Sequence, residues 1–134
     1  MTPIETRGFE LADWQVEAAE AWERGDVNGR YRGTLEIVTG GGKTLIALEC
    51  VGRASRIVED LHVAIVVPTE ALARQWTEVV LRHTTLGASD IGLLGAGGDD
   101  TFAKCRVLIA VLNSASKRLP ELARDGQPLM LVID

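Results

Sequence analysis

Apolar residues recur every three or four positions in several segments of the chain, which is the spacing of an amphipathic helix. The first stripe consists of four residues: Leu11, Trp14, Ala18 and Trp22. It predicts a helix that ends at Gly25. Similar spacing predicts a second helix over residues 44–55 and a third over residues 70–83, for which Thr69 is a suitable N-cap.

Short runs of consecutive apolar residues form the second pattern, which is typical of strands covered on both faces. The runs lie within HVAIVV at 62–67, RVLIAVL at 106–112 and LMLVI at 129–133, and TLEIV at 34–38 predicts a further short strand. Segment 91–100 predicts a shorter strand and a glycine-rich turn, and short helices are expected around residues 115–118 and 121–124. Because strands alternate with helices, we predict an α/β fold, with a mostly parallel sheet and helices on both faces.

The 134 residues suffice for one domain, and no internal repeat or linker divides residues 1–134. The net charge of −5 argues against non-specific affinity for nucleic acid through bulk charge. No apolar run could span a membrane and the first ten residues lack a signal-peptide core, so we expect a cytoplasmic protein without a membrane partner. Cys50 and Cys105 are too few and too far apart for a metal site, and we predict that they pack in the core.

The segment TGGGKT lies between the strand predicted at 34–38 and the following helix. Its residues are Thr39, Gly40, Gly41, Gly42, Lys43 and Thr44. Glycines let backbone N–H groups converge on an anion, and the start of a helix adds partial positive charge. Lys43 would then contact the β- and γ-phosphates of a nucleotide, and the Thr44 hydroxyl would ligate Mg²⁺. The alternative is an ordinary glycine turn beside a surface lysine, which seldom supplies Gly-Lys-Thr at the start of a helix.

Two further residues complete a candidate nucleotide site. Asp134 follows the last apolar run, and ligands of doubly wound sheets collect at the carboxyl ends of strands. A carboxylate there can hold Mg²⁺ opposite Thr44, and the alternative is a strand-capping aspartate. Gln15 can pair with the N6/N7 edge of adenine, although a glutamine on an amphipathic helix is usually solvated. The expected cofactors are therefore ATP and Mg²⁺, with Lys43 and Asp134 as catalytic residues.

Together these segments resemble the first RecA-like domain of superfamily 2 helicases and translocases, in order through nearly the whole chain. Within that group the chain is most similar to the DEAD/DEAH-type and repair-helicase branch and to type III restriction subunits. The similar segments are LADWQVEAAEAW (11–22), VTGGGKT (38–44), VVPTEALARQW (66–76), VLIAVLNSASK (107–117) and LVID (131–134). Three positions depart from the pattern. Trp14 replaces the usual tyrosine beside Gln15. Ile37 replaces a small residue of the full phosphate loop, and Val111 replaces a threonine that contacts the nucleic-acid backbone.

The resemblance implies a RecA-like, three-layer α/β/α fold and an ATP-dependent helicase or translocase. Its track would be nucleic acid, with DNA favoured over RNA. By the same resemblance, four residues would contact nucleic acid: Pro68, Thr69, Gln75 and Ser114. Helix N-termini and small polar residues can hold phosphates, so a strongly basic surface is unnecessary. A second RecA-like domain of a longer parent chain would close over the nucleotide.

The resemblance also implies that residues 1–134 form an incomplete ATP-binding domain, ending within the acidic motif and without the second domain. In the family, the strand between the glycine-loop strand and the acid strand follows the acid in sequence. We therefore expect a gap or a repaired register at the centre of the sheet, with exposed strand edges. We also expect the chain alone to bind nucleotide without efficient turnover. Two alternatives stay open: another P-loop NTPase such as a kinase or GTPase, or an interaction module with a vestigial nucleotide pocket.

Overall fold

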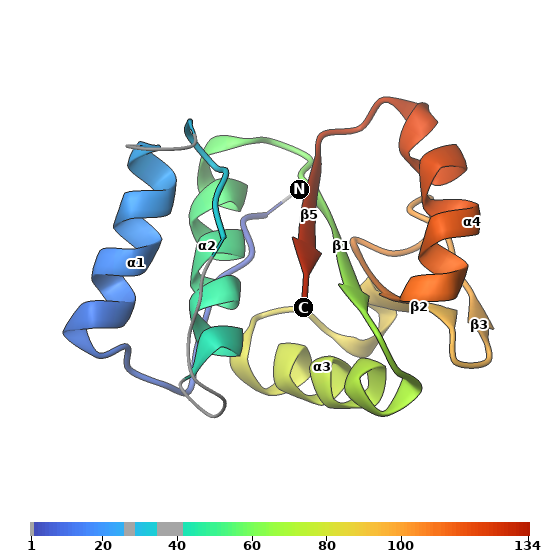
Figure 1. Cartoon of the computed structure of the whole chain (residues 1–134), viewed down its shortest axis with the longest axis horizontal. Helices are drawn as coiled ribbons and strands as arrows, with labels where there is room; N and C mark the ends of the chain where they lie inside the picture. Colours follow the sequence, from blue (N-terminus) through green and yellow to red (C-terminus); the bar gives the residue numbers. More distant parts are fainter. Residues whose placement is uncertain (1, 26–28, 35–41) are drawn as a thin grey trace.

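The computed structural model describes residues 2–25, 29–34 and 42–134, and its helices lie on both sides of one sheet (Figure 1). The helices are α1 (Asp13–Arg24), α2 (Lys43–Ile57), α3 (Glu70–His83) and α4 (Leu112–Leu122), with 3₁₀ turns η1 (Ala88–Asp90) and η2 (Ala123–Asp125). The strands are β1 (His62–Val67), β2 (Ile91–Gly95), β3 (Gly98–Asp99), β4 (Val107–Val111) and β5 (Leu129–Ile133). In Figure 1, α1 and α2 lie to one side of β1 and β5, and α4 lies to the other.

The strands are arranged in the order β3-β2-β4-β1-β5, and every neighbouring pair except β2 and β3 is parallel. This arrangement confirms the predicted α/β fold with a mostly parallel sheet. In the described part of the chain, β5 is an edge strand. Two of its side chains, Leu131 and Ile133, point to the same face of the sheet and are 52% and 70% exposed. Residues 35–38 of the strand predicted at 34–38 lie outside the described residues.

Each face of the sheet carries its own apolar core. The core beneath α2 and α3 includes Leu48, Ile65, Trp76, Val80 and Ile109. The core beneath α4 includes Ala64, Val66, Leu108, Ala115 and Leu122. Because β1 and β4 are covered on both faces, nearly all their residues are apolar. Cys50 and Cys105 are buried as predicted, and burial raises the pKa of the Cys50 thiol to about 12.

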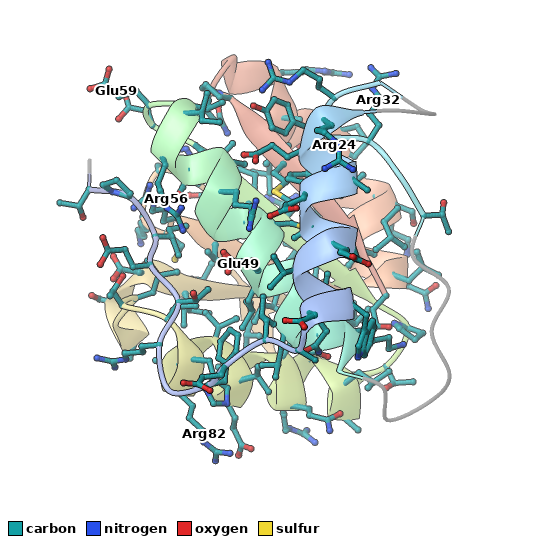
Figure 2. All side chains as sticks on the ribbon, turned by 90° about the vertical axis from the view of Figure 1, so that its left-hand side faces the viewer. Arg24, Arg32, Glu49, Arg56, Glu59 and Arg82 are labelled. Atoms are coloured by element: carbon teal, nitrogen blue, oxygen red, sulfur yellow. The ribbon has the colours of Figure 1, made fainter. Side chains whose placement is uncertain are left out.

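The first three helices lie close to their predicted positions. The residue after α1, Gly25, has the left-handed φ of 73° that glycine adopts without strain. The predicted N-cap of α3, Thr69, accepts a hydrogen bond on Oγ1 from the Leu72 N–H at 3.2 Å. Figure 2 shows α1 and α2 side by side, and Arg53 Nη1 of α2 lies 3.3 Å from Glu23 Oε1 of α1. Among the described residues, no helix combines the length and apolar character needed to cross a membrane.

The structure corrects the prediction of two short helices after β4. A single helix, α4, passes through Pro120, and only the 3₁₀ turn η2 follows it. A proline inside a helix costs about 3 kcal/mol, whereas burying a leucine side chain contributes roughly 1.5–3 kcal/mol. Leu119 and Leu122 both pack in the core beneath α4, so their burial offsets the cost of the proline.

A short strand, β3, occupies part of the segment that was predicted to be a glycine-rich turn. It runs antiparallel to β2 and pairs Asp99 with Leu94. The two residues between the strands, Ala96 and Gly97, have φ values of 53° and 89°. Positive φ at both positions is what a two-residue type I′ hairpin turn requires. The glycine-rich segment therefore forms a β-hairpin at the sheet edge.

Candidate functional site

The parallel strands bring several chain segments together at the carboxyl end of the sheet. Thr69 lies just beyond β1, α4 begins where β4 ends, and Asp134 follows β5. The Asp134 N–H donates to the Val66 carbonyl at 2.9 Å, which extends the pairing of β5 with β1. Lys43 begins α2, and its ammonium reaches Asp134 at this same end of the sheet. Ligands of doubly wound sheets bind at the carboxyl ends of strands, which is where these residues meet.

Lys43 and Asp134, the two predicted catalytic residues, form an ion pair with 2.7 Å between Nζ and Oδ1. The other carboxylate oxygen, Oδ2, accepts a hydrogen bond from the Trp76 indole Nε1–H at 3.0 Å. The side chain of Lys43 is 52% exposed, whereas that of Asp134 is 13% exposed. A largely buried carboxylate is therefore held between an exposed ammonium and an indole N–H.

These contacts determine the protonation of Asp134. The hydrogen bond from the Lys43 ammonium and then that from the Trp76 indole lower the pKa of the Asp134 carboxyl, while burial opposes them. The result is a pKa below the ordinary value of 3.8. Asp134 is therefore ionised at neutral pH, which is the form that binds a metal ion.

The oxygen atoms that Asp134 and Thr44 can offer suit Mg²⁺. Asp134 supplies carboxylate oxygen, and Thr44 supplies a hydroxyl from the first turn of α2, where it is half-buried. Across the described residues, no group of three or more His, Cys, Asp or Glu side chains could hold a metal by itself. Mg²⁺ usually takes one or two protein ligands and completes its shell with phosphate oxygens and water, so this donor set fits a metal–nucleotide complex.

Gln15 lies against the end of the glycine loop. Its side chain is buried, Oε1 accepts from the Ala12 N–H at 2.8 Å, and Nε2 donates to the Gly42 carbonyl at 3.3 Å. Gly42 has a φ of 80°, and a Cβ built there would lie 2.5 Å from Gln15 Nε2. The positive φ therefore favours glycine at position 42, and a Cβ there would displace the Gln15 amide from its contact. The adenine contact proposed for Gln15 stays a prediction, whereas its role in bracing Gly42 was not anticipated.

The remaining loop residues predicted to bind phosphate, Thr39, Gly40 and Gly41, lie outside the described residues. The glycine loop is therefore represented only by Gly42, the N-cap of α2. The first two residues of that helix, Lys43 and Thr44, follow it directly in the chain.

The four residues predicted to contact nucleic acid lie at or near the carboxyl end of the sheet. Pro68, Thr69 and Gln75 are exposed, the first two before α3 and the third within it. Ser114 is half-buried in the first turn of α4, where a Cβ built on Gly95 would lie 2.7 Å from its Oγ. The sheet therefore brings the ends of β1, β2 and β4 together here, and contact with nucleic acid stays a prediction.

Trp76 is a site residue that the sequence did not identify as such. Its position in the segment VVPTEALARQW matched the family pattern, but no role was predicted for it. A usable signal was present, because a buried tryptophan normally finds a hydrogen-bond acceptor for its indole N–H. Trp76 is only 4% exposed, and Asp134 supplies that acceptor.

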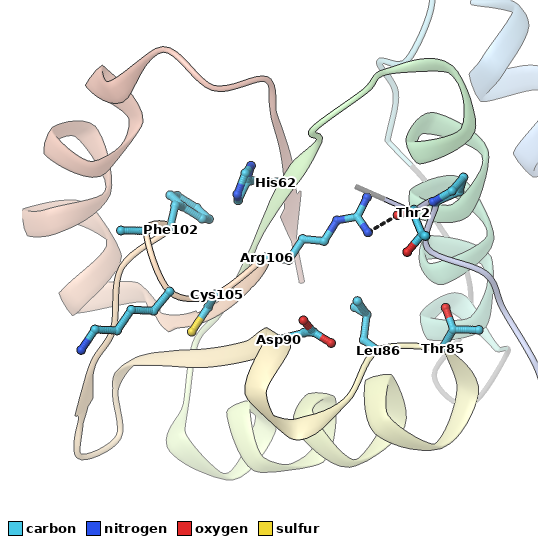
Figure 3. Close-up of a pocket in the computed structure, with 11 residues that line it drawn as sticks. Thr2, His62, Thr85, Leu86, Asp90, Phe102, Cys105 and Arg106 are labelled. Atoms are coloured by element: carbon cyan, nitrogen blue, oxygen red, sulfur yellow. Dashed lines mark hydrogen bonds between the residues drawn. The ribbon is translucent and has the colours of Figure 1, made fainter.

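Two cavities adjoin the sheet. One of about 480 Å³ adjoins the ion pair, and its walls include Trp22, Lys43, Trp76 and Asp134. The other, of about 310 Å³, lies where β1, β2 and β4 begin (Figure 3). There the buried Arg106 side chain donates to the carbonyls of Leu61 and Thr2. Arg106 thus fastens the N-terminal segment to the sheet, and we assign this second cavity a structural role.

Comparison with known proteins relates the chain to one described family and to a named relative. Residues 8–134 match the family described as "Type III restriction enzyme, res subunit". The chain is also 34% identical over 131 residues to the protein named "DNA 3'-5' translocase XPB2" from Sulfurisphaera tokodaii. The aligned region covers 96% of this chain but only 26% of that relative, so the chain spans about a quarter of the relative's length.

Proposed function

Because the chain belongs to the family of type III restriction enzyme res subunits, we propose that it forms the ATP-binding part of an ATP-dependent helicase or translocase. Its family membership bears out the resemblance to the first RecA-like domain of superfamily 2 helicases and translocases. The similar relative is named a DNA 3'-5' translocase, so we favour DNA as the track. Since the chain spans 26% of that relative, hydrolysis and movement are proposed for the whole protein.

The observation that carries this proposal is the contact between Lys43 and Asp134 at the carboxyl edge of the sheet. Their 2.7 Å separation places an ammonium and an ionised carboxylate within reach of one metal–nucleotide complex. A pair buried deep in the core would suggest a structural role instead. Here Lys43 is 52% exposed, so its ammonium can turn toward an incoming phosphate.

Each described residue then has a distinct task in nucleotide binding. Lys43 would neutralise the β- and γ-phosphates, and the start of α2 would contribute backbone N–H groups. Thr44 and Asp134 would hold Mg²⁺, which supplies charge neutralisation and bridges phosphate oxygens when bound. Gln15 keeps Gly42 in place and is our candidate for contact with adenine.

The nucleic acid would lie across the helix starts that follow β1 and β4. Thr69 and Ser114 are small polar residues at these helix starts, and Pro68 and Gln75 are exposed close to Thr69. Backbone N–H groups at helix starts bind phosphate oxygens, so such contact does not require a basic surface. This arrangement is compatible with the net charge of −5.

We expect residues 1–134 alone to bind Mg·nucleotide without efficient turnover. In the related mechanism, a second RecA-like domain contributes an arginine that stabilises the transition state. Such an arginine accelerates related phosphoryl transfers by roughly 10³–10⁵-fold. Joining this chain to that second domain should therefore raise the rate of phosphate release far more than it raises nucleotide affinity.

Thermal unfolding with Mg·ADP tests the proposal. We expect Mg·ADP to raise the melting temperature of the wild-type chain and to leave that of Lys43→Ala unchanged. Lys104→Ala is a matched control, because Lys104 is an exposed lysine that lines the other cavity, where β1, β2 and β4 begin. It should respond as the wild type does. An equal response from Lys43→Ala would contradict the proposal.

The alternatives make different predictions in the same assay. Another P-loop NTPase, such as a GTPase, would be stabilised more by Mg·GDP than by Mg·ADP. An interaction module with a vestigial pocket would respond to neither nucleotide, and its Lys43→Ala variant would show the same lack of response as the wild type.

A further inference from the structure

We infer that Trp76 is a positioning residue that holds Asp134 in the orientation needed to receive Mg²⁺. The inference rests on the proposed function, because it concerns how the metal–nucleotide complex is bound. Its starting point is the 3.0 Å hydrogen bond from Trp76 Nε1–H to Asp134 Oδ2. Nothing in the family match or in the relative's name assigns a role to this tryptophan.

The indole can hold the carboxylate because packing fixes the indole itself. Trp76 is 4% exposed and belongs to the core formed by α2, α3 and the sheet. Trp76 belongs to α3, whereas Asp134 is held to β1 through its own backbone N–H. The hydrogen bond therefore joins two rigid parts of the fold. A donor whose ring cannot move confers direction on the carboxylate as well as energy.

The two oxygens of Asp134 have unequal partners, and this difference suggests how the site changes when nucleotide binds. Oδ1 faces Lys43, whose side chain is long and 52% exposed and can turn away toward a phosphate. Oδ2 faces the buried Trp76, which cannot leave. Release of Lys43 would free Oδ1 for the metal shell while Oδ2 stays fixed. Hydrogen bonds to a metal-binding carboxylate orient it in this way in other metal sites.

The location of Trp76 also connects Asp134 to the proposed nucleic-acid surface. Its neighbour in sequence, Gln75, is exposed on the same helix, and Thr69 caps the start of that helix. One hydrogen bond therefore separates α3 from the acid proposed to hold the metal.

The first test compares Trp76→Phe with the wild type and with Trp22→Phe. Phenylalanine keeps an aromatic ring but removes the N–H. Trp22 lines the same cavity without a hydrogen bond to Asp134, so the same substitution there is a matched control. We expect the pKa of the Asp134 carboxyl, followed by ¹³C NMR titration, to rise in Trp76→Phe only. Loss of an orienting partner weakens metal binding by about 10–100-fold, so affinity for Mg·ADP should fall by about tenfold while affinity for ADP without Mg²⁺ is retained.

A second measurement needs no variant. The chain has three tryptophans, and their indole N–H signals can be followed in the wild type as the pH is lowered. The Trp76 signal should shift with the titration of Asp134, while the signals of Trp14 and Trp22 should not follow it. This result would support the contact even if Trp76→Phe failed to fold.

The outcomes separate the inference from the proposed function. If the wild type binds Mg·ADP but Trp76→Phe has the same Mg·ADP affinity and the same Asp134 pKa, the inference is wrong and the proposed function stands. If the wild type does not bind Mg·ADP at all, the proposed function fails, and with it the metal-positioning role.

Discussion

The Lys43 ammonium lies 2.7 Å from the Asp134 carboxylate, although 91 positions separate the two residues in the chain. The start of α2 and the end of β5 therefore meet at one point. We expect a phosphate that engages Lys43 and a metal that engages Asp134 to separate the two side chains. Mg·nucleotide would thus replace one ion pair with two new contacts. This exchange would link nucleotide binding to the contact between the start of α2 and the end of β5.

The lowered pKa of Asp134 predicts how stability depends on pH. A folded-state pKa below the unfolded one means that the unfolded chain binds more protons, so this group contributes stability that is present at higher pH. The contribution should be complete at neutral pH and should be lost as the pH falls below the ordinary value of 3.8 and through the folded-state pKa. Urea unfolding of the wild type and Asp134→Asn should show the wild type as more stable at neutral pH and the difference shrinking in acid. A difference that does not depend on pH would contradict the assignment.

Gly42→Ala should destabilise the fold more than Gly126→Ala. Both glycines have a φ near 80°, at 80° and 79°, but a Cβ at Gly126 would meet nothing within 4 Å, whereas one at Gly42 would lie 2.5 Å from Gln15 Nε2. The backbone cost, about 1–2 kcal/mol, is shared by the two variants. Loss of the bond from Gln15 to Gly42 adds about 1 kcal/mol to the first. Chemical denaturation measures the difference, which should disappear when both variants are made in a Gln15→Ala background.

Thr69→Ala should reduce stability through the loss of the N-cap of α3. Thr69 Oγ1 accepts from the Leu72 N–H at 3.2 Å, and replacing such a cap by alanine costs about 0.5–2 kcal/mol. Thr69→Ser keeps the hydroxyl and should retain nearly all of the free energy of unfolding. Oligonucleotide binding by the same two variants tests the second proposed role of Thr69. Equal affinity of both variants for single-stranded DNA would remove Thr69 from the proposed surface.

Much of the fold could be predicted because its patterns are local. The apolar runs of β1 and β4 and the stripes of the helices each depend on neighbours in sequence, and Gly25 and Thr69 mark helix boundaries. The prediction of two short helices was wrong at α4, which continues through Pro120. Burial of Leu119 and Leu122 against the sheet decided the outcome, and that packing depends on tertiary contacts.

The candidate site was predicted in part for a similar reason. Chemistry and position suggested Lys43 and Asp134, since an acid after a parallel strand reaches the edge at which a phosphate-binding loop emerges. The bond between Trp76 and Asp134 crosses from α3 to β5. No local pattern specifies which acceptor a buried indole will meet. The bracing of Gly42 by Gln15 likewise becomes visible only when α1 packs on α2.

A crystal structure of the chain with Mg·ADP bound would test the central claim most directly. We expect the Lys43 ammonium to leave Asp134 for the β-phosphate, and the metal to lie between the Thr44 hydroxyl and Asp134, directly or through water. The Trp76 indole should remain on Oδ2. A nucleotide bound away from the start of α2, with the Lys43–Asp134 ion pair intact, would contradict the account.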